Sequence, residues 1–338
     1  MIAFGSPHDL SFPRFNKRVS NAMGHITAST LPAPAIEPVP EGTRRPFWSV
    51  MIPVYNSADY LRETLHCVLA QDPGANEMEI EVVDNCSTKD DPEAVVRELG
   101  GGRIKFHRQA ENIGAIRNFN TCISRSNGQW LHILHADDIV RPGFYAHARQ
   151  AIIANPQISA VNFRTIYIDG SGMWTHLAMA EMTKPGVLGE EFIARQLRSQ
   201  RIQCVGMIVR RSVYEELGGY RPELGPCTDW EMWNRIVVRK DIFYDPEPLA
   251  CYRLHAAADT AQRVRTGENV AAERRSIELS CSYVPEDQGK RLYREAMNAA
   301  AKRAIRRMRR HWKEGDHAIA WHQLREALLC GIASRSVF

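Results

Sequence analysis

The chain of 338 residues lacks the features of zinc-finger, disulfide-rich and membrane-spanning proteins. Its eight cysteines are scattered, with no Cys-x-x-Cys pair and no clustered histidines, which argues against a zinc site and against a disulfide framework. No segment approaches the ~18 apolar residues of a membrane span, and the N-terminus has no apolar core ahead of a small-residue cleavage site. We therefore expect a cytoplasmic protein whose contact with a membrane would be peripheral.

Net charge is also small, +4 for the whole chain, and it is distributed unevenly. Between residues 286 and 314, ten Lys and Arg residues stand against four Asp and Glu residues. No basic surface interleaved with aromatic residues and no nucleic-acid motif is present, so we expect no nucleic-acid partner. The basic segment allows two interpretations: a packing appendage with a solvated basic face, or a docking element for anionic lipid or an acidic glycan.

Three regions follow from the hydrophobic pattern. Residues 1–46 lack periodicity and end in a proline-rich run, which is typical of an extended leader. Residues 47–256 alternate short apolar runs with amphipathic segments, and this alternation predicts an α/β fold with a doubly wound, mostly parallel sheet. Residues 257–338 predict a basic α-helical appendage, in which 302–310 and 318–329 form a helix–turn–helix hairpin of the tetratricopeptide type.

Polar residues follow the predicted strands of this sheet, where ligands bind beyond the carboxyl ends of the strands. Asp84 comes after the strand at 79–83 and could accept hydrogen bonds from the N–H of a uracil-like base. Asn112 and Gly114 come after the strand at 103–107 and could meet ribose and phosphates. An ordinary turn or a helix entry is the alternative for each of these residues.

The apolar run Trp130–Ala136 stops on two adjacent acids, Asp137 and Asp138. Two carboxylates at the rim of a rigid strand suit Mg²⁺ or Mn²⁺, which proteins usually bind through one or two carboxylates and substrate phosphates. The alternative is that one of the acids caps the helix that follows Pro142-Gly143. A similar choice applies to Asp229, which lies at the predicted start of a helix, where Asp is a favoured cap.

Taken in order, these segments resemble the landmarks of the family 2 glycosyltransferases, which have a GT-A fold of the nucleotide-diphospho-sugar transferase type. The resemblance covers residues 47–256, and the ordered set carries it rather than any single motif. The matching segments are Val50–Asn56, Val83–Thr88, Asn112-x-Gly114 with Asn118, Ala136-Asp137-Asp138, Thr228-Asp229-Trp230 and Tyr252-Arg253-x-His255.

The resemblance implies an inverting transferase that moves a sugar from a nucleoside diphosphate, with a UDP-sugar favoured, to a hydroxyl of a glycan, lipid-linked or small-molecule acceptor. Asp229 would be the general base, and Asp137 with His255 would hold Mn²⁺ or Mg²⁺. Trp230 and Glu231 would line the sugar or acceptor pocket, whereas helical spacing favours a core position for Trp233. Nucleotide-sugar binding would fall to Pro53, Val54, Tyr55, Asn56, Asp84, Asn112, Gly114, Arg117, Asn118, His135, Ala136, Asp137 and Arg253.

Two positions depart from the family pattern. His135 replaces the first acid of the Asp-x-Asp element, and Thr228 stands where the family often has Glu. The first change favours a second hypothesis, a nucleotide-sugar-binding module without catalysis, while the presence of Asp229 and His255 favours an enzyme. A nucleotidyltransferase would be expected to carry a glycine-rich loop after the first strand, where this chain has Tyr55-Asn56-Ser57.

Overall fold

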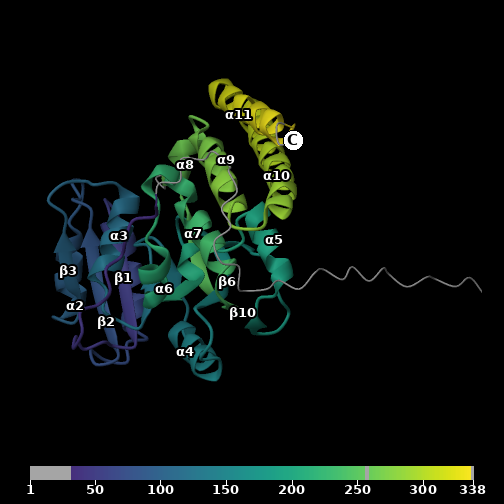
Figure 1. Ribbon diagram of the computed structural model, residues 1–338. Helices are drawn as coiled ribbons and strands as arrows, with labels where there is room; N and C mark the ends of the chain where they lie inside the picture. The colour runs from purple at the N-terminus through teal and green to yellow at the C-terminus, as the bar shows by residue number, and fades with distance from the viewer. Residues whose placement is uncertain (1–31, 256–258, 336–338) are drawn as a thin grey trace, which may run out of the picture.

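The computed structural model describes residues 32–255 and 259–335 and contains one mixed sheet with helices on both faces (Figure 1). The strand order is β3-β2-β1-β4-β9-β6-β10-β5, with β7 paired to β6 and β8 paired to β10. The strands are β1 Trp48–Val54, β2 Met78–Asp84, β3 Lys105–Arg108, β4 Trp130–Ile133, β5 Ile139–Val140, β6 Ala160–Asp169, β7 Trp174–Leu177, β8 Gly186–Val187, β9 Met207–Arg210 and β10 Ile242–Leu254.

The helices follow the predicted amphipathic segments closely. They are α1 Ala58–Leu69, α2 Pro92–Gly100, α3 Ala115–Arg125, α4 Phe144–Ala154, α5 Glu190–Arg198, α6 Arg211–Leu217, α7 Thr228–Val237, α8 Asp259–Val264, α9 Glu268–Cys281, α10 Glu286–Lys313 and α11 His317–Arg335, with 3-10 turns η1 Cys204–Gly206 and η2 Pro222–Cys227. In the described part of the chain, no helix is both long enough and apolar enough to cross a membrane.

The strands β3, β2, β1 and β4 are parallel neighbours and form the half of the sheet that carries the first strand-end loops. All seven residues of β1 are buried, as expected of a central strand covered on both faces. Because β1 runs parallel to β2 and β4, the loops after Val54, Asp84 and Ile133 leave the sheet at the same edge. The predicted doubly wound α/β sheet is therefore confirmed.

The other half of the sheet is mixed. β9 lies between β4 and β6 and is antiparallel to both, whereas β10 is parallel to β6. Hydrophobicity predicts a short strand at 205–209, but nothing in that pattern indicates its direction or its neighbours. β10 is also longer than the predicted strand at 249–255, because it begins at Ile242 and continues past a register shift after Asp245.

Two hydrophobic clusters cover the two faces of the sheet. One contains side chains of α1, α2 and α4, and the other contains side chains of α3, α5, α6 and α7. Val270 and Ile277 of α9 and Leu292 of α10 belong to this second cluster, together with Trp230 and Trp233 of α7. The C-terminal helices thus share the core of the sheet instead of forming a separate one, and the core position expected for Trp233 is confirmed.

The predicted helical hairpin at the C-terminal end is present as α10 and α11, which pack against each other; α11 lies at the top of the molecule and α10 lies beside α9 (Figure 1). α10 begins at Glu286, well before the predicted start at residue 302, and has 28 residues. Its first part packs on α5 and α9. The basic segment is therefore a long structural helix whose outer side carries the charge.

Part of the predicted leader packs on the fold. Ile36 is buried in the core, Pro34 accepts a hydrogen bond from the backbone of Gly219, and the carbonyl of Glu37 accepts one from Arg211. Residues 32–46 contain no helix or strand, so their extended character is as expected, but the ordered part begins before residue 47. The rest of the leader, residues 1–31, lies outside the described residues.

Candidate active site

The turn that follows β4 carries the acid pair and is held from two sides. The hydroxyl of Thr64 on α1 donates to the carbonyl oxygens of Ala136 and Asp138, at 2.8 Å each. From β10, the side chain of Arg253 donates to the carbonyl of Asp137 at 2.7 Å, and its backbone N–H donates to the Asp138 carboxylate at 2.9 Å. The position of both acids is therefore set by contacts with two other elements.

The capping alternative for these acids is wrong. The N-cap of α4 is Gly143, with no side-chain hydrogen bond to the helix start, and the carboxylate of Asp137 instead accepts a hydrogen bond from His255 at 2.9 Å. Burial opposes ionisation of Asp137, yet the hydrogen bond from His255 and the proximity of His135 hold the pKa of its carboxyl below the ordinary value. Asp137 is therefore ionised at neutral pH.

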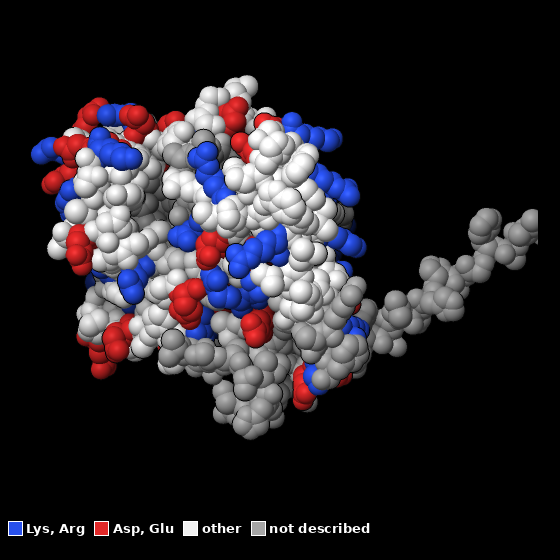
Figure 2. Space-filling view, turned by 90° about the horizontal axis from the view of Figure 1, so that it is seen from above, with Lys and Arg blue, Asp and Glu red and all other residues white. Residues whose placement is uncertain are grey.

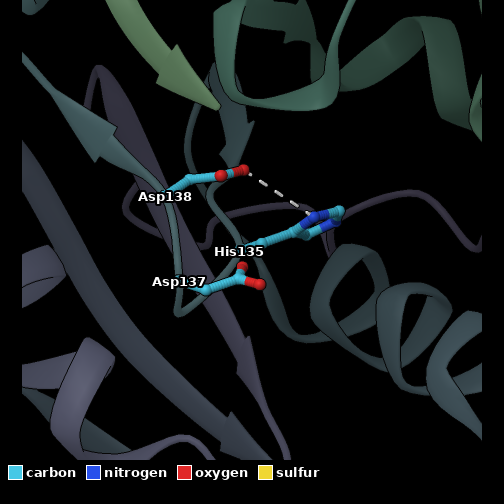
Figure 3. A group of neighbouring side chains, drawn as sticks. All are labelled: His135, Asp137 and Asp138. Atoms are coloured by element: carbon cyan, nitrogen blue, oxygen red, sulfur yellow. Dashed lines mark ion pairs between the residues drawn. The ribbon is translucent and has the colours of Figure 1, made fainter. Parts of the chain in front are cut away.

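His135, Asp137 and Asp138 present one ligand atom each within 4.8 Å of one another, and their side chains leave the turn toward the same side (Figure 3). Two buried atoms of this group, Nε2 of His135 and one carboxylate oxygen of Asp138, have no hydrogen-bond partner among the described residues. Unsatisfied buried polar atoms are costly, which points to a missing ligand. Burial lowers the pKa of His135, so its ring is neutral and able to coordinate a cation. These residues fit a divalent metal.

The structure places His255 differently from the other candidate ligands. Its Nε2 bonds to Asp137, and its ring packs against Tyr60 at a centroid distance of 5.0 Å. His255 thus orients the Asp137 carboxylate, as residues that hydrogen-bond to a metal ligand commonly do. Asp138, the second acid of the pair that the sequence offered for a cation, supplies the third ligand atom of the group, although the family resemblance implied only Asp137 and His255.

Asp229 lies in the first turn of α7, after the N-cap residue Cys227. Its carboxylate accepts two hydrogen bonds of 2.7 Å each. One comes from the backbone N–H of the neighbouring Trp230, and the other comes from the side chain of Gln200. Burial raises the pKa of Asp229 to about 6, although these hydrogen bonds oppose the shift. A carboxylate with a pKa near the working pH is suited to take a proton during catalysis.

The hydroxyl of Tyr252 is influenced by acids from both parts of the chain. Burial raises the pKa of its hydroxyl, and the charges of Asp138, Asp137 and Asp229 raise it further. One side chain therefore lies within electrostatic range of all three acids, although residues 137 and 229 are far apart in the sequence. The turn after β4 and the start of α7 therefore both place an acid near the hydroxyl of Tyr252.

The loops after β1 and β2 lie beside this site and are tied to each other. The side-chain oxygen of Asn56 accepts hydrogen bonds from the backbone N–H groups of Thr88 and Lys89. Asn56 and Cys86 adopt positive φ angles of 52° and 63°, a conformation that is uncommon outside glycine and concentrates at functional sites. Tyr55 is 43% exposed at this edge. Asn112, Gly114 and Arg117 are exposed at the start of α3, while Pro53, Val54 and Ala136 are buried beneath the loops.

Two predicted contact residues are instead bonded to the protein itself. Asp84 is fully buried, and its carboxylate accepts hydrogen bonds from Ser87 and from Arg108, the latter at 2.6 Å. Asn118 is buried and donates to the carbonyl of Val83. Both side chains are buried and bonded to protein atoms, so the expected direct contacts to base and ribose are corrected to support of the loops.

Arg253 also has a structural position. Its side chain is fully buried and donates to the carbonyls of Asp137 and Gly170 and to the carboxylate of Glu63. Each guanidinium nitrogen is bonded to a protein oxygen. The side chain therefore contacts the protein and not the space where a diphosphate would bind. The expectation is corrected: Arg253 holds the turn that carries the acid pair in place.

Trp230 and Glu231 do not line a pocket. Trp230 is 2% exposed and its indole N–H donates to the carbonyl of Gln196, while Glu231 is fully buried with ion pairs to Arg235 and Arg221. The assignment of both to a sugar or acceptor pocket is therefore wrong. The reason is that helix α7 turns Asp229 toward the site and its next two residues into the core.

Residues 49–218 match the sequence profile of glycosyl transferase family 2, which is half of the chain. The chain belongs to this family. Among its relatives, the succinoglycan biosynthesis protein ExoO of Rhizobium meliloti is 31% identical over 141 residues, covering 41% of this chain and 38% of ExoO. The family assignment establishes a glycosyltransferase and rests on the segment that contains the acid pair.

Two solved glycosyltransferases share the fold. Staphylococcus aureus TarS, residues 1–349, in complex with UDP-GlcNAc has a TM-score of 0.53 at 16% identity and covers 84% of this chain and 92% of that one. The mannosyltransferase PcManGT of Pyrobaculum calidifontis, in complex with GDP-Man and Mn²⁺, has a TM-score of 0.51 at 18% identity and covers 90% of both chains. At these identities the similarity establishes the GT-A fold of this family 2 glycosyltransferase.

The role given to Arg253 predicts a loss of stability on substitution. Arg253→Gln should lower the free energy of unfolding by about 2–4 kcal/mol, because the carbonyls of Asp137 and Gly170 would lose their donor. Arg62→Gln is the matched control, since the ion pair of Arg62 with Glu98 is exposed on both sides and contributes little. Urea unfolding of the two variants measures the difference, and equal midpoints would contradict the role.

The sequence did not predict a role for several residues of the site. Gln200 and Tyr252 are polar residues in or beside apolar segments, and Thr64 is one of several polar residues in α1. Each acts through a partner distant in sequence, so no local spacing marks it. Tyr252 had the clearest signal, since it opens the segment that ends in His255.

Proposed function

We propose that this glycosyltransferase is an inverting enzyme that transfers a sugar from a UDP-sugar to a hydroxyl of a glycan acceptor in polysaccharide synthesis. The observation that carries the proposal is Asp229, a half-buried carboxylate with a pKa of about 6 that lies, like Asp137 and Asp138, within electrostatic range of Tyr252. The TarS complex with UDP-GlcNAc supports the donor, and the role of ExoO in succinoglycan synthesis supports the product class.

In this mechanism Asp229 takes the proton of the acceptor hydroxyl while the acceptor oxygen attacks the anomeric carbon. The bond from that carbon to the diphosphate breaks on the opposite face, so the configuration inverts. A positioned base of this kind contributes about 10²–10⁴-fold. Gln200 keeps the Asp229 carboxylate oriented through its 2.7 Å hydrogen bond.

His135, Asp137 and Asp138 would hold the divalent cation. When bound, such an ion neutralises the charge that develops on the departing diphosphate. An imidazole beside two carboxylates suits Mn²⁺ better than Mg²⁺, which prefers oxygen ligands alone. The mannosyltransferase solved with GDP-Man and Mn²⁺ is in accord with this choice.

We assign the acceptor to a region around Tyr252, which is within electrostatic range of Asp229. Tyr252 packs edge-on against Tyr167 at 5.7 Å, Tyr167 stacks on His176 of β7 at 4.1 Å, and the hydroxyl of Tyr167 accepts a hydrogen bond from Gln203. We call Tyr167, His176, Gln203 and Tyr252 the aromatic shelf. Its flat rings and amide group suit a sugar ring, which offers C–H faces and hydroxyls.

The aromatic shelf gives a separate prediction about the acceptor. His176→Ala should raise the acceptor KM by ~10-fold, because one stacking contact is worth about 1 kcal/mol or slightly more. Affinity for UDP-sugar and hydrolysis of the donor without acceptor should be unchanged. His147→Ala, which removes a half-exposed histidine of α4, is the control. An unchanged acceptor KM in His176→Ala would remove the shelf from the acceptor site.

The proposed function itself is tested with a panel of nucleotide sugars, with Mn²⁺ and with a chelator. We expect one UDP-sugar to raise the melting temperature in the presence of Mn²⁺ and to be hydrolysed slowly. Stabilisation without hydrolysis or transfer would favour a binding module, the alternative that the His135 substitution supports. Selective stabilisation by another nucleotide would overturn the UDP assignment.

A further inference from the structure

Helix α11 is apolar on two opposite sides. Ala320, Ala327 and Cys330 are buried on one side, where α11 packs on α10 and α9. On the other side Leu328 and Ile332 are 61% and 65% exposed. A surface helix normally turns its apolar side chains toward the core, so the exposed apolar side chains of α11 have no partner in the described part of the chain.

Two tryptophans extend this surface. Trp321 of α11 is 59% exposed, and Trp312 near the end of α10 is 49% exposed and lies against Trp321 with a ring distance of 6.3 Å. A shallow groove of about 300 Å³ runs between the exposed side chains, lined by Trp321, Leu324, Arg325, Leu328 and Leu329. We call Trp321, Leu324, Leu328 and Ile332, together with the adjoining Trp312 of α10, the outer face of α11.

Positive charge borders the outer face. Seen from above, Lys and Arg side chains form a row along the margin of a broad uncharged surface at this end of the molecule (Figure 2). Five exposed cations of α10 recur at helical spacing and make no ion pair among the described residues. They are Arg291, Lys302, Arg306, Arg309 and Lys313.

We propose that the outer face of α11 docks on an anionic membrane surface, with the cations of α10 beside it. Indole rings favour the boundary between headgroups and acyl chains, and aliphatic side chains enter it by about 5–10 Å. Each basic residue near an anionic leaflet adds ~1 kcal/mol of attraction. This proposal goes beyond glycosyl transfer and stands whichever donor the enzyme uses.

The charges favour a lipid surface over a second copy of the chain. A symmetric dimer through the outer face would bring the Arg325 residues and the α10 cations of two copies toward each other, and like charges across an interface are unfavourable. An anionic bilayer offers complementary charge along the whole row. The docking is peripheral, because it uses one side of a helix whose other side is packed on the protein.

The test uses the full chain and vesicles of phosphatidylcholine with or without phosphatidylglycerol. We expect the protein to sediment with the anionic vesicles only. Raising the salt from about 0.1 M to about 1 M should weaken binding at least tenfold, because the Debye length falls from ~10 Å to ~3 Å. The double variant Leu328→Gln and Ile332→Gln should weaken binding tenfold or more at low salt, since two exposed apolar side chains are lost.

The control is Met173→Gln with Met179→Gln, two residues 67% and 71% exposed near β7, which should bind vesicles like the native protein. Absence of native binding to anionic vesicles at low salt would overturn the proposal. So would equal binding by the α11 and control variants. A dimer in light scattering that the α11 variant abolishes would assign the outer face to a second copy instead.

Discussion

Replacing Asp137 by alanine should lower the transfer rate by about 10³-fold and remove the effect of Mn²⁺ on UDP binding. Asp137 is the ionised member of the proposed metal group, and His255 holds its carboxylate in one orientation. Electrostatic stabilisation of a leaving group is usually the largest catalytic contribution, and loss of one such group costs ~10²–10³-fold. We therefore expect this variant to be more damaging than loss of the base.

The measurement is calorimetry of UDP binding, with Mn²⁺ and with a chelator, for the native protein and Asp137→Ala. The native protein should bind more tightly with Mn²⁺, whereas the variant should bind equally weakly in both conditions. Asp91→Asn is the control, because Asp91 is an exposed cap of α2 and Asn caps as well as Asp. If the native protein bound UDP equally well with Mn²⁺ and with the chelator, the proposed metal role of this site would be excluded.

Asp229→Asn should lower turnover by ~10²-fold or more and leave the affinity for UDP-sugar within a few-fold. Asparagine keeps the shape of the side chain and can still accept the hydrogen bond of the Trp230 N–H, but it cannot take a proton. Near-native turnover would exclude Asp229 as the base. Glu231 could not replace it, because Glu231 is buried in ion pairs with Arg221 and Arg235.

The pKa of Asp229 gives this prediction a pH dependence. The base must be ionised, so native turnover should fall as the pH drops through about 6, and the residual turnover of the Asn variant should lack that step. The folding stability should depend on pH in the opposite direction from the turnover. The folded state holds this proton more tightly than the unfolded chain, whose Asp has a pKa near 4, so native stability should decline as the pH rises from ~4 to ~6. Asp229→Asn should show a smaller decline, because Asp138, whose pKa burial also raises, still contributes; thermal unfolding of both proteins across that range measures the difference.

The sequence alone was sufficient for the fold and for the acid pair. Short apolar runs alternating with amphipathic helices specify a doubly wound sheet, because each strand and helix must bury its apolar residues against a neighbour. The carboxyl ends of parallel strands then lie at one edge, which places Asp137 and the loops after β1 and β2 together. The family landmarks added the expectation that Asp229, far along the chain, belongs to the same site.

Only the tertiary structure decided which side chains face the site. Asp84, Asn118 and Arg253 stand at the expected positions but bond to protein atoms, and Trp230 and Glu231 turn into the core. Local pattern specifies the element that carries a residue, whereas its partners come from segments up to about 200 residues away, such as Glu63 for Arg253. The unpartnered face of α11 has the same origin, since a run of apolar residues does not reveal that α10 and α9 cover only one of its sides.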